Sequence, residues 1–221
     1  MTAPTPTTGS QPTDPHPAPE PGTTGPDAPA AGRPAFARAI TEIGAPWVLI
    51  VALFLAVGAH AAGWAGLAWG LAGAFFASLG PMALIARGTR AGRYSDHHLT
   101  ERSHRIKPLL GAVALVVAGL VLGKLADAPG EVYAVMAAML AGLAVTVPIT
   151  LRWKISFHAG VAAALVGILT LVYGPAASIG WAAVALIAWS RVRLGDHTLT
   201  QVIAGAIIGG GAATAVYALV A

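Results

Sequence analysis

The residues that could carry chemistry gather in three polar segments, and the most informative reads SRVRLGDHTLTQ over residues 190–201. The other two are GRYSDHHLTERSHRIKP over 92–108 and RWKISFHAG over 152–160. Arginine binds phosphate through a bidentate fork and lysine binds it as a point charge. Histidine can act as a nucleophile or as a general acid near neutral pH. The segments therefore indicate phosphoryl transfer through a covalent intermediate, in which positioning and charge neutralisation supply most of the catalysis.

The chain that must position these residues is strongly apolar. It has 221 residues, of which 56% are hydrophobic and 10% are charged, and its mean hydropathy is +0.71. Soluble domains carry about 25% charged residues, so the composition indicates an integral membrane protein. The absence of cysteine excludes a disulfide, a thiolate nucleophile and a cysteine-ligated metal.

The apolar runs predict an all-α fold, a polytopic transmembrane helical bundle of six to seven spans. A membrane-spanning helix needs about 20 mainly apolar residues. Candidate spans cover residues 46–63, 64–86, 108–126, 132–151, 157–173, 175–190 and 198–220. The boundary near Gly63 is soft and the segment 175–190 is short, so six spans remain an alternative to seven.

The N-terminal region differs from the rest of the chain. Residues 1–34 hold most of the 16 prolines and no apolar run, so they cannot bury enough surface to offset their ordering entropy. We expect a disordered Pro/Thr/Gly-rich tail over residues 1–40, followed by one transmembrane domain over 41–221. Within that domain, Gly205 and Gly209 form a small-residue pair that lets helices approach closely in lipid.

The order of the spans predicts that the three polar segments share one membrane face. Two crossings separate the first segment from the second, and two more separate the second from the third. With seven spans, all 13 lysines and arginines except Lys124 fall on this face. The positive-inside tendency then predicts a multi-pass protein of the cell membrane with a cytoplasmic site face and an external C-terminus.

The third segment resembles the third motif of the type-2 phosphatidic-acid phosphatase superfamily, whose site is shared with vanadium haloperoxidases. That motif runs Ser-Arg, five residues, His, three residues, Asp, and here Ser190, Arg191 and His197 match it in type and spacing. The second motif, Pro-Ser-Gly-His, is similar to residues 155–158, where Ser156 and His158 are kept. The first motif, Lys, six residues, Arg-Pro, is matched only by Lys107-Pro108 with Arg102 and Arg105 nearby.

The resemblance implies a membrane phosphatase that acts on a lipid phosphate or a prenyl (pyro)phosphate. His197 would be the nucleophile that becomes phosphohistidine, and His158 would protonate the leaving alcohol. The phosphate oxygens would be held by Arg191, Ser190, Ser156, Lys107, Arg105 and Arg102. The resemblance implies no cofactor and no metal. The expected partners are the lipid substrate and the bilayer, with no nucleic acid, and the sequence predicts no oligomeric state.

Position 201 departs from the family pattern, because Gln201 stands where the family has Asp. It lies four positions after His197, so on a helix the two would share a face, and the amide oxygen could accept a hydrogen bond from the imidazole. A neutral amide cannot stabilise an imidazolium by charge. Asp196 is adjacent to His197, and neighbours in a helix point in different directions. The alternative function is therefore a weak or inactive member that binds or transports an anionic lipid.

A metal site is the remaining alternative for the first polar segment. Asp96, His97, His98 and His104 are metal-ligating residue types. Adjacent histidines face apart unless the loop bends, so we do not expect a metal there.

Overall fold

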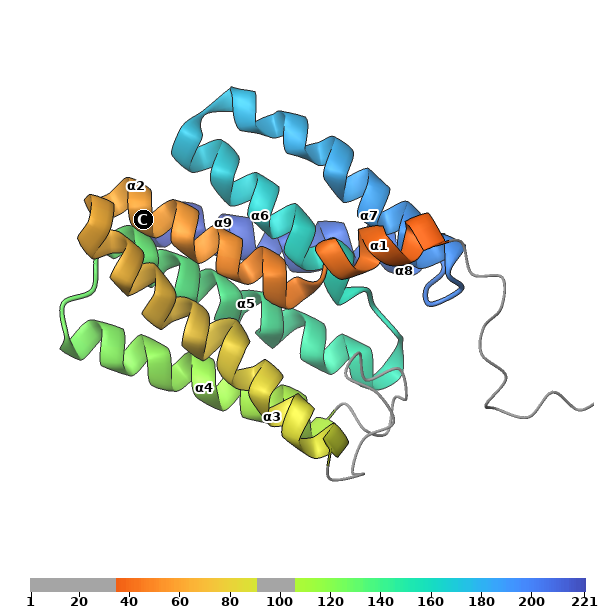
Figure 1. Ribbon diagram of the computed structural model, residues 1–221, viewed down its shortest axis with the longest axis horizontal. Helices are drawn as coiled ribbons and strands as arrows, with labels where there is room; N and C mark the ends of the chain where they lie inside the picture. The colour runs from red at the N-terminus through yellow and green to blue at the C-terminus, as the bar shows by residue number, and fades with distance from the viewer. Residues whose placement is uncertain (1–34, 91–105) are drawn as a thin grey trace, which may run out of the picture. The chain divides into compact units, whose positions relative to one another are not determined.

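The computed structural model describes residues 35–90 and 106–221, and this part of the chain contains helices and no strand (Figure 1). The all-α prediction is therefore confirmed for the described residues. The polar segment at 92–108 lies mostly outside them, and so do the predicted tail and the candidate metal ligands Asp96, His97, His98 and His104.

The first helix, α1 (Ala35–Ile43), begins inside the region predicted as tail. The tail boundary expected at residue 40 therefore falls within a helix. A search for long apolar runs overlooks such a segment, because α1 has nine residues and only one apolar face. The hydroxyl of Thr41 binds the hydroxyl of Ser190 at 3.0 Å, which attaches α1 to the later helix α7 (Trp181–Arg193).

Helix α2 (Pro46–Ala74) contains a reversal, and it continues through η1 (Phe75–Leu79) into α3 (Gly80–Arg90). Ala62 and Gly63 leave helical geometry, and Gly63 has φ of 53°, a conformation that glycine adopts without a Cβ penalty. A Cβ on Gly58 would clash with the backbone of Gly66, so the two arms lie in backbone contact on either side of the turn. The boundary near Gly63 between the first two predicted spans is thus a tight helical hairpin.

The remaining helices follow the predicted spans closely. They are α4 (Ile106–Leu125), α5 (Gly130–Arg152), α6 (Phe157–Tyr173), η3 (Pro175–Gly180), α7 (Trp181–Arg193), α8 (Leu199–Ala204), η4 (Gly205–Gly210) and α9 (Gly211–Val220). Helix α5 packs against α2, α4 and α9, and α6 packs against α2, α7 and η4 (Figure 1). Both η1 and η4 are short π-helical turns, a local distortion that is often found at functional sites.

Five stretches of the described residues are long and apolar enough to cross a membrane. They are Pro46–Arg90, Pro108–Leu125, Gly130–Arg152, Pro175–Arg193 and Leu199–Val220. Large apolar side chains also lie exposed on the helices, for example Trp64, Ile179 and Leu219. Such surfaces suit lipid, because the hydrocarbon region is as apolar as these side chains.

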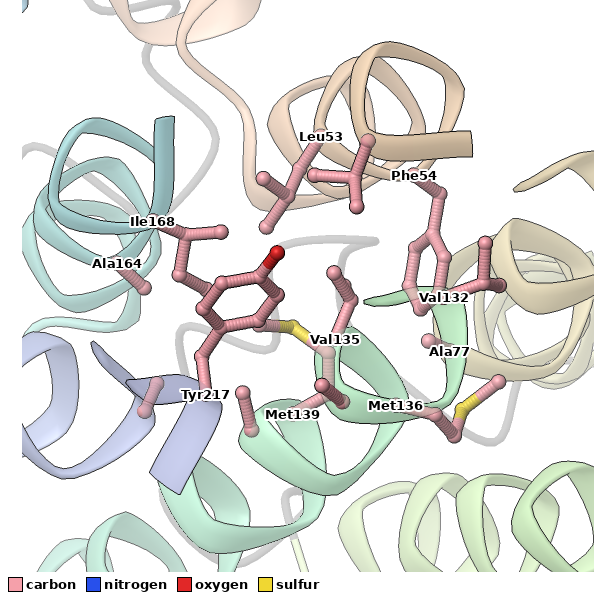
Figure 2. Close-up of a cluster of buried hydrophobic side chains, with 14 of the residues drawn as sticks. Leu53, Phe54, Ala77, Val132, Val135, Met136, Met139, Ala164, Ile168 and Tyr217 are labelled. Atoms are coloured by element: carbon pink, nitrogen blue, oxygen red, sulfur yellow. The ribbon is translucent and has the colours of Figure 1, made fainter. Parts of the chain in front are cut away.

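The buried core lies where α2, α5, α6 and α9 meet (Figure 2). The ring of Tyr217 lies among Leu53, Met139 and Ile168, which come from three different helices. In lipid such contacts stabilise the fold through van der Waals packing, because burial brings no gain from leaving water. This packing fixes the helices whose ends carry the polar segments.

Candidate active site

The third polar segment forms a tight turn at the end of α7. Gly195 has φ of 73°, which lets the chain reverse immediately after the helix. The backbone N–H groups of Asp196 and His197 both donate to the carbonyl oxygen of Arg191, at 3.1 and 3.2 Å. Arg191 Nη2 pairs with Asp196 Oδ2 at 3.2 Å, and both side chains are largely buried. The turn therefore holds an arginine, an aspartate and a histidine close together.

Gln201 orients His197 and also caps the helix that follows. Its side-chain oxygen Oε1 accepts the N–H of Thr198 at 3.1 Å, while the Thr198 hydroxyl accepts the N–H of Gln201 at 3.3 Å. This reciprocal pair is a capping box at the start of α8. The same Oε1 lies 3.2 Å from His197 Nδ1, and the carbonyl oxygen of Lys154 lies 3.3 Å from that nitrogen. Both partners are acceptors, so the hydrogen bonds assign the proton to Nδ1 and leave the lone pair on Nε2.

The surroundings of His197 favour its neutral form. Burial lowers its pKa to about 4, assisted by the positive charges of Arg191 and Lys154. The hydrogen bonds to Gln201 and to the carbonyl of Lys154 raise the pKa and offset part of this effect. At neutral pH the imidazole is therefore uncharged, the state in which Nε2 can act as a nucleophile.

The second polar segment lies directly beside this turn. Ser156 is the N-cap of α6, and its hydroxyl accepts the N–H of Ala159 at 3.4 Å. Its own backbone N–H donates to the carbonyl oxygen of Gln201 at 3.2 Å, which joins the second segment to the third. Gly205 makes this approach possible, because a Cβ there would clash with the carbonyl of Ser156. The predicted packing role of Gly205 is thus confirmed.

A cavity of about 250 Å³ lies between the helices and has two chemically different parts. One end is lined by polar residues from the second and third segments: Lys154, His158, Arg191, Asp196 and His197. Apart from Ser78 and Thr146, the rest of the lining is mainly apolar and includes Ile50, Met82, Ile85, Leu109 and Leu143 from α2, α3, α4 and α5. The arrangement suits a molecule with an anionic head and an apolar body.

The structure brings together some of the predicted site residues and leaves others away from the cavity. His158, Arg191 and His197 lie on the cavity wall, and Gln201 contacts His197. Ser156 and Ser190 do not line the cavity. Ser190 donates to the carbonyl of Ile187 at 2.7 Å, so it accepts the hydrogen bond from Thr41. Arg102, Arg105 and the side chain of Lys107 lie outside the described residues.

Two charged residues of the cavity wall, Lys154 and Asp196, were not predicted as site residues. The sequence places Lys154 on the basic face, two positions before Ser156, and the structure adds that it lines the cavity. The expectation that Asp196 and His197 point apart holds for a helix, whereas residues 194–198 form a turn and not a helix. Gly195 was the signal for that turn, because glycine is common immediately after a helix end.

Comparisons with known proteins add no assignment to this geometry. No protein-family model matches the chain, and neither a curated protein nor a solved structure matches it. The likeness to the phosphatase superfamily therefore rests on the motif residues alone.

Proposed function

We propose that the protein is a membrane phosphatase that hydrolyses a lipid phosphate or a prenyl (pyro)phosphate through a phosphohistidine. The observation that carries this proposal is the shared cavity: two histidines and two basic side chains line one end, and mainly apolar side chains line the rest. The polar end fits the phosphate group and the apolar part fits the hydrocarbon chain.

The hydrogen bonds support a nucleophilic role for His197. Its Nε2 attacks the phosphorus atom while the bond from phosphorus to the lipid oxygen breaks, and His158 donates a proton to that oxygen. Water then attacks the phosphorus of the phosphohistidine, His158 accepts a proton from the water, and phosphate leaves with His197 neutral again. Throughout, Gln201 and the carbonyl of Lys154 hold the proton on Nδ1.

We also propose that the chain crosses the cell membrane seven times. The hairpin at Gly63 divides the 45-residue stretch Pro46–Arg90 into two crossings, and the shorter apolar helix Phe157–Tyr173 adds one more. The two described polar segments then lie at the same side, which the basic residues mark as cytoplasmic. A reporter fused to the C-terminus tests this, because seven crossings from a cytoplasmic N-terminus place the C-terminus outside.

A phosphate-release assay tests the catalytic proposal. Purified protein in detergent should release phosphate from at least one member of a panel of lipid phosphates and prenyl diphosphates. His197→Ala should abolish release and His158→Ala should lower it strongly, whereas Arg152→Ala at the exposed end of α5 should not. Full activity in His197→Ala would exclude the proposed nucleophile.

The alternative is a protein that binds or transports an anionic lipid without turnover, and Gln201 is the observation that favours it. A neutral amide gives a charged imidazole no electrostatic support. This function predicts lipid binding with no release of phosphate. Trapping a phosphohistidine at position 197 by rapid quenching would exclude it.

A further inference from the structure

Three charged side chains, Lys154, Arg191 and Asp196, lie on the wall of the cavity beside the two histidines. Their arrangement is built into the backbone. The turn at Gly195 brings the N–H of Asp196 to the carbonyl of Arg191, and their side chains meet at 3.2 Å. The Asp196 carboxylate is therefore held in place against the guanidinium.

Arg191 needs an anion because it is buried, with 6% of its surface exposed. A charge that is taken out of water strongly destabilises the fold unless an opposite charge and hydrogen bonds compensate it. Asp196 supplies this opposite charge, because its Oδ2 lies 3.2 Å from Arg191 Nη2. An anionic ligand that reaches Arg191 would supply the same compensation.

Lys154 lies on the cavity wall together with Arg191 and Asp196. It is partly buried, it lines the cavity, and its carbonyl oxygen lies 3.3 Å from His197 Nδ1. Its charge also acts at this end of the cavity, because together with Arg191 it lowers the pKa of His197. Arg152, two residues earlier, is exposed and does not line the cavity.

We propose that Lys154 and Arg191 are the two cations of an anion subsite and that Asp196 is the anion that occupies it when no ligand is bound. An incoming phosphate group is attracted by Lys154 and competes with Asp196 for Arg191. Asp196 thus stabilises the empty protein and weakens the binding of phosphate, which assists its release. The inference rests on the proposed function only for the choice of phosphate as the anion.

Direct binding of inorganic phosphate at low ionic strength tests the subsite, measured by titration calorimetry on purified protein in detergent. Asp196→Asn should bind phosphate more tightly and Lys154→Met more weakly, each by about tenfold, the factor that one charged hydrogen bond supplies. Asp127→Asn and Arg152→Met are the matched controls, because both residues are exposed and neither lines the cavity. Neither control should change the affinity.

Whether each variant binds phosphate more tightly or more weakly decides the inference. If Asp196→Asn weakens phosphate binding, Asp196 positions Arg191 and does not compete with phosphate, and the proposal fails. If Lys154→Met binds phosphate like Arg152→Met, Lys154 is not part of the subsite, and the proposal also fails. If Asp196→Asn folds only in the presence of phosphate, the ligand has replaced the missing carboxylate as proposed. If this variant does not fold at all, the comparison of Lys154→Met with Arg152→Met decides alone.

Failure of the proposed function is a separate result. If Asp196→Asn binds phosphate more tightly and Lys154→Met more weakly, but no lipid yields phosphate, the subsite is supported and the enzymatic function is excluded. If the protein releases phosphate from a lipid but Asp196→Asn and Lys154→Met bind phosphate with unchanged affinity, the enzymatic function is supported and the subsite is excluded.

Discussion

The contact between Gly205 and Ser156 should control the distance between the two histidine segments. A Cβ on residue 205 would lie 3.3 Å from the Cβ of Ser156, 3.2 Å from its carbonyl carbon and much closer to its carbonyl oxygen. A carbon atom approaches a carbonyl oxygen to about 3.3 Å, so Gly205→Ala must displace the start of α6 by roughly 1 Å. His158 lies in the first turn of α6 and moves with it.

This displacement should affect both activity and stability. A misplacement of 1 Å at a catalytic group can reduce the rate about 100-fold, and overpacking a close contact costs about 1–3 kcal/mol of unfolding free energy. The hydrogen bond from the Ser156 N–H to the Gln201 carbonyl oxygen, now 3.2 Å, should weaken as well. Gly205→Ala should therefore melt at a lower temperature and release phosphate about 100-fold more slowly.

Gly211→Ala is the matched control, because a Cβ there meets no atom within 4 Å. Both substitutions bring the same gain of up to about 1 kcal/mol from alanine's higher helix propensity, so their difference isolates the contact with Ser156. The assays are thermal unfolding in detergent and phosphate release at a temperature where both variants are folded. Equal melting temperatures and equal rates for the two variants would refute the role assigned to Gly205, and the melting comparison holds even without an enzymatic activity.

Two further predictions concern His197 and its partners. Because burial lowers the pKa of His197 to about 4, the unfolded chain binds the proton more strongly, and its ordinary pKa is 6.5. The contribution of the neutral imidazole to stability is therefore complete above pH 6.5 and is lost as the pH falls toward 4. Melting temperatures should decline over this range more steeply in the natural protein than in His197→Asn, and parallel curves would contradict the assignment. Gln201→Leu should lower kcat by about 100-fold, because His197 loses one of the two acceptors that hold its proton on Nδ1 and keeps only the Lys154 carbonyl. Thr198→Val, which removes the hydroxyl half of the capping box and the hydroxyl contact with Thr200 but keeps the Gln201 side chain, should cost about 1 kcal/mol of stability and leave kcat unchanged. A kcat equally low in both variants would show that Gln201 acts only as a cap.

The helices and the meeting of two polar segments could be predicted from the sequence. The apolar run predicted over 157–173 has the same bounds as α6, and the run over 132–151 lies within α5. The order of the spans predicted a common face for the second and third segments, and Ser156 does bond to Gln201. These features follow from the lengths of the apolar runs and from the even number of membrane crossings between the polar segments. Neither depends on local geometry.

The directions of the short polar side chains could not be predicted in the same way. A serine hydroxyl at a helix end can turn to the nearest backbone group or to a ligand, and spacing does not distinguish the two. Ser156 accepts from a backbone N–H, and Ser190 donates to a backbone carbonyl. Lys154 was missed for a related reason, because a lysine at a membrane face fits topology and ligand binding equally well.

The presence of Asp196 gives a physical reason for a neutral residue at position 201. The described part of the site has two cations, Lys154 and Arg191, and Asp196 already offsets one of them. A second carboxylate at position 201 would reduce the positive charge that faces a phosphate group, whereas the amide oxygen keeps the hydrogen bond to His197 without adding charge. The neutral partner gives no charge stabilisation to a phosphorylated imidazolium, so the intermediate should form more slowly and break down faster. Rapid quenching should therefore trap less phosphohistidine in the natural protein than in Gln201→Glu, and equal amounts would show that charge at this position does not govern the intermediate.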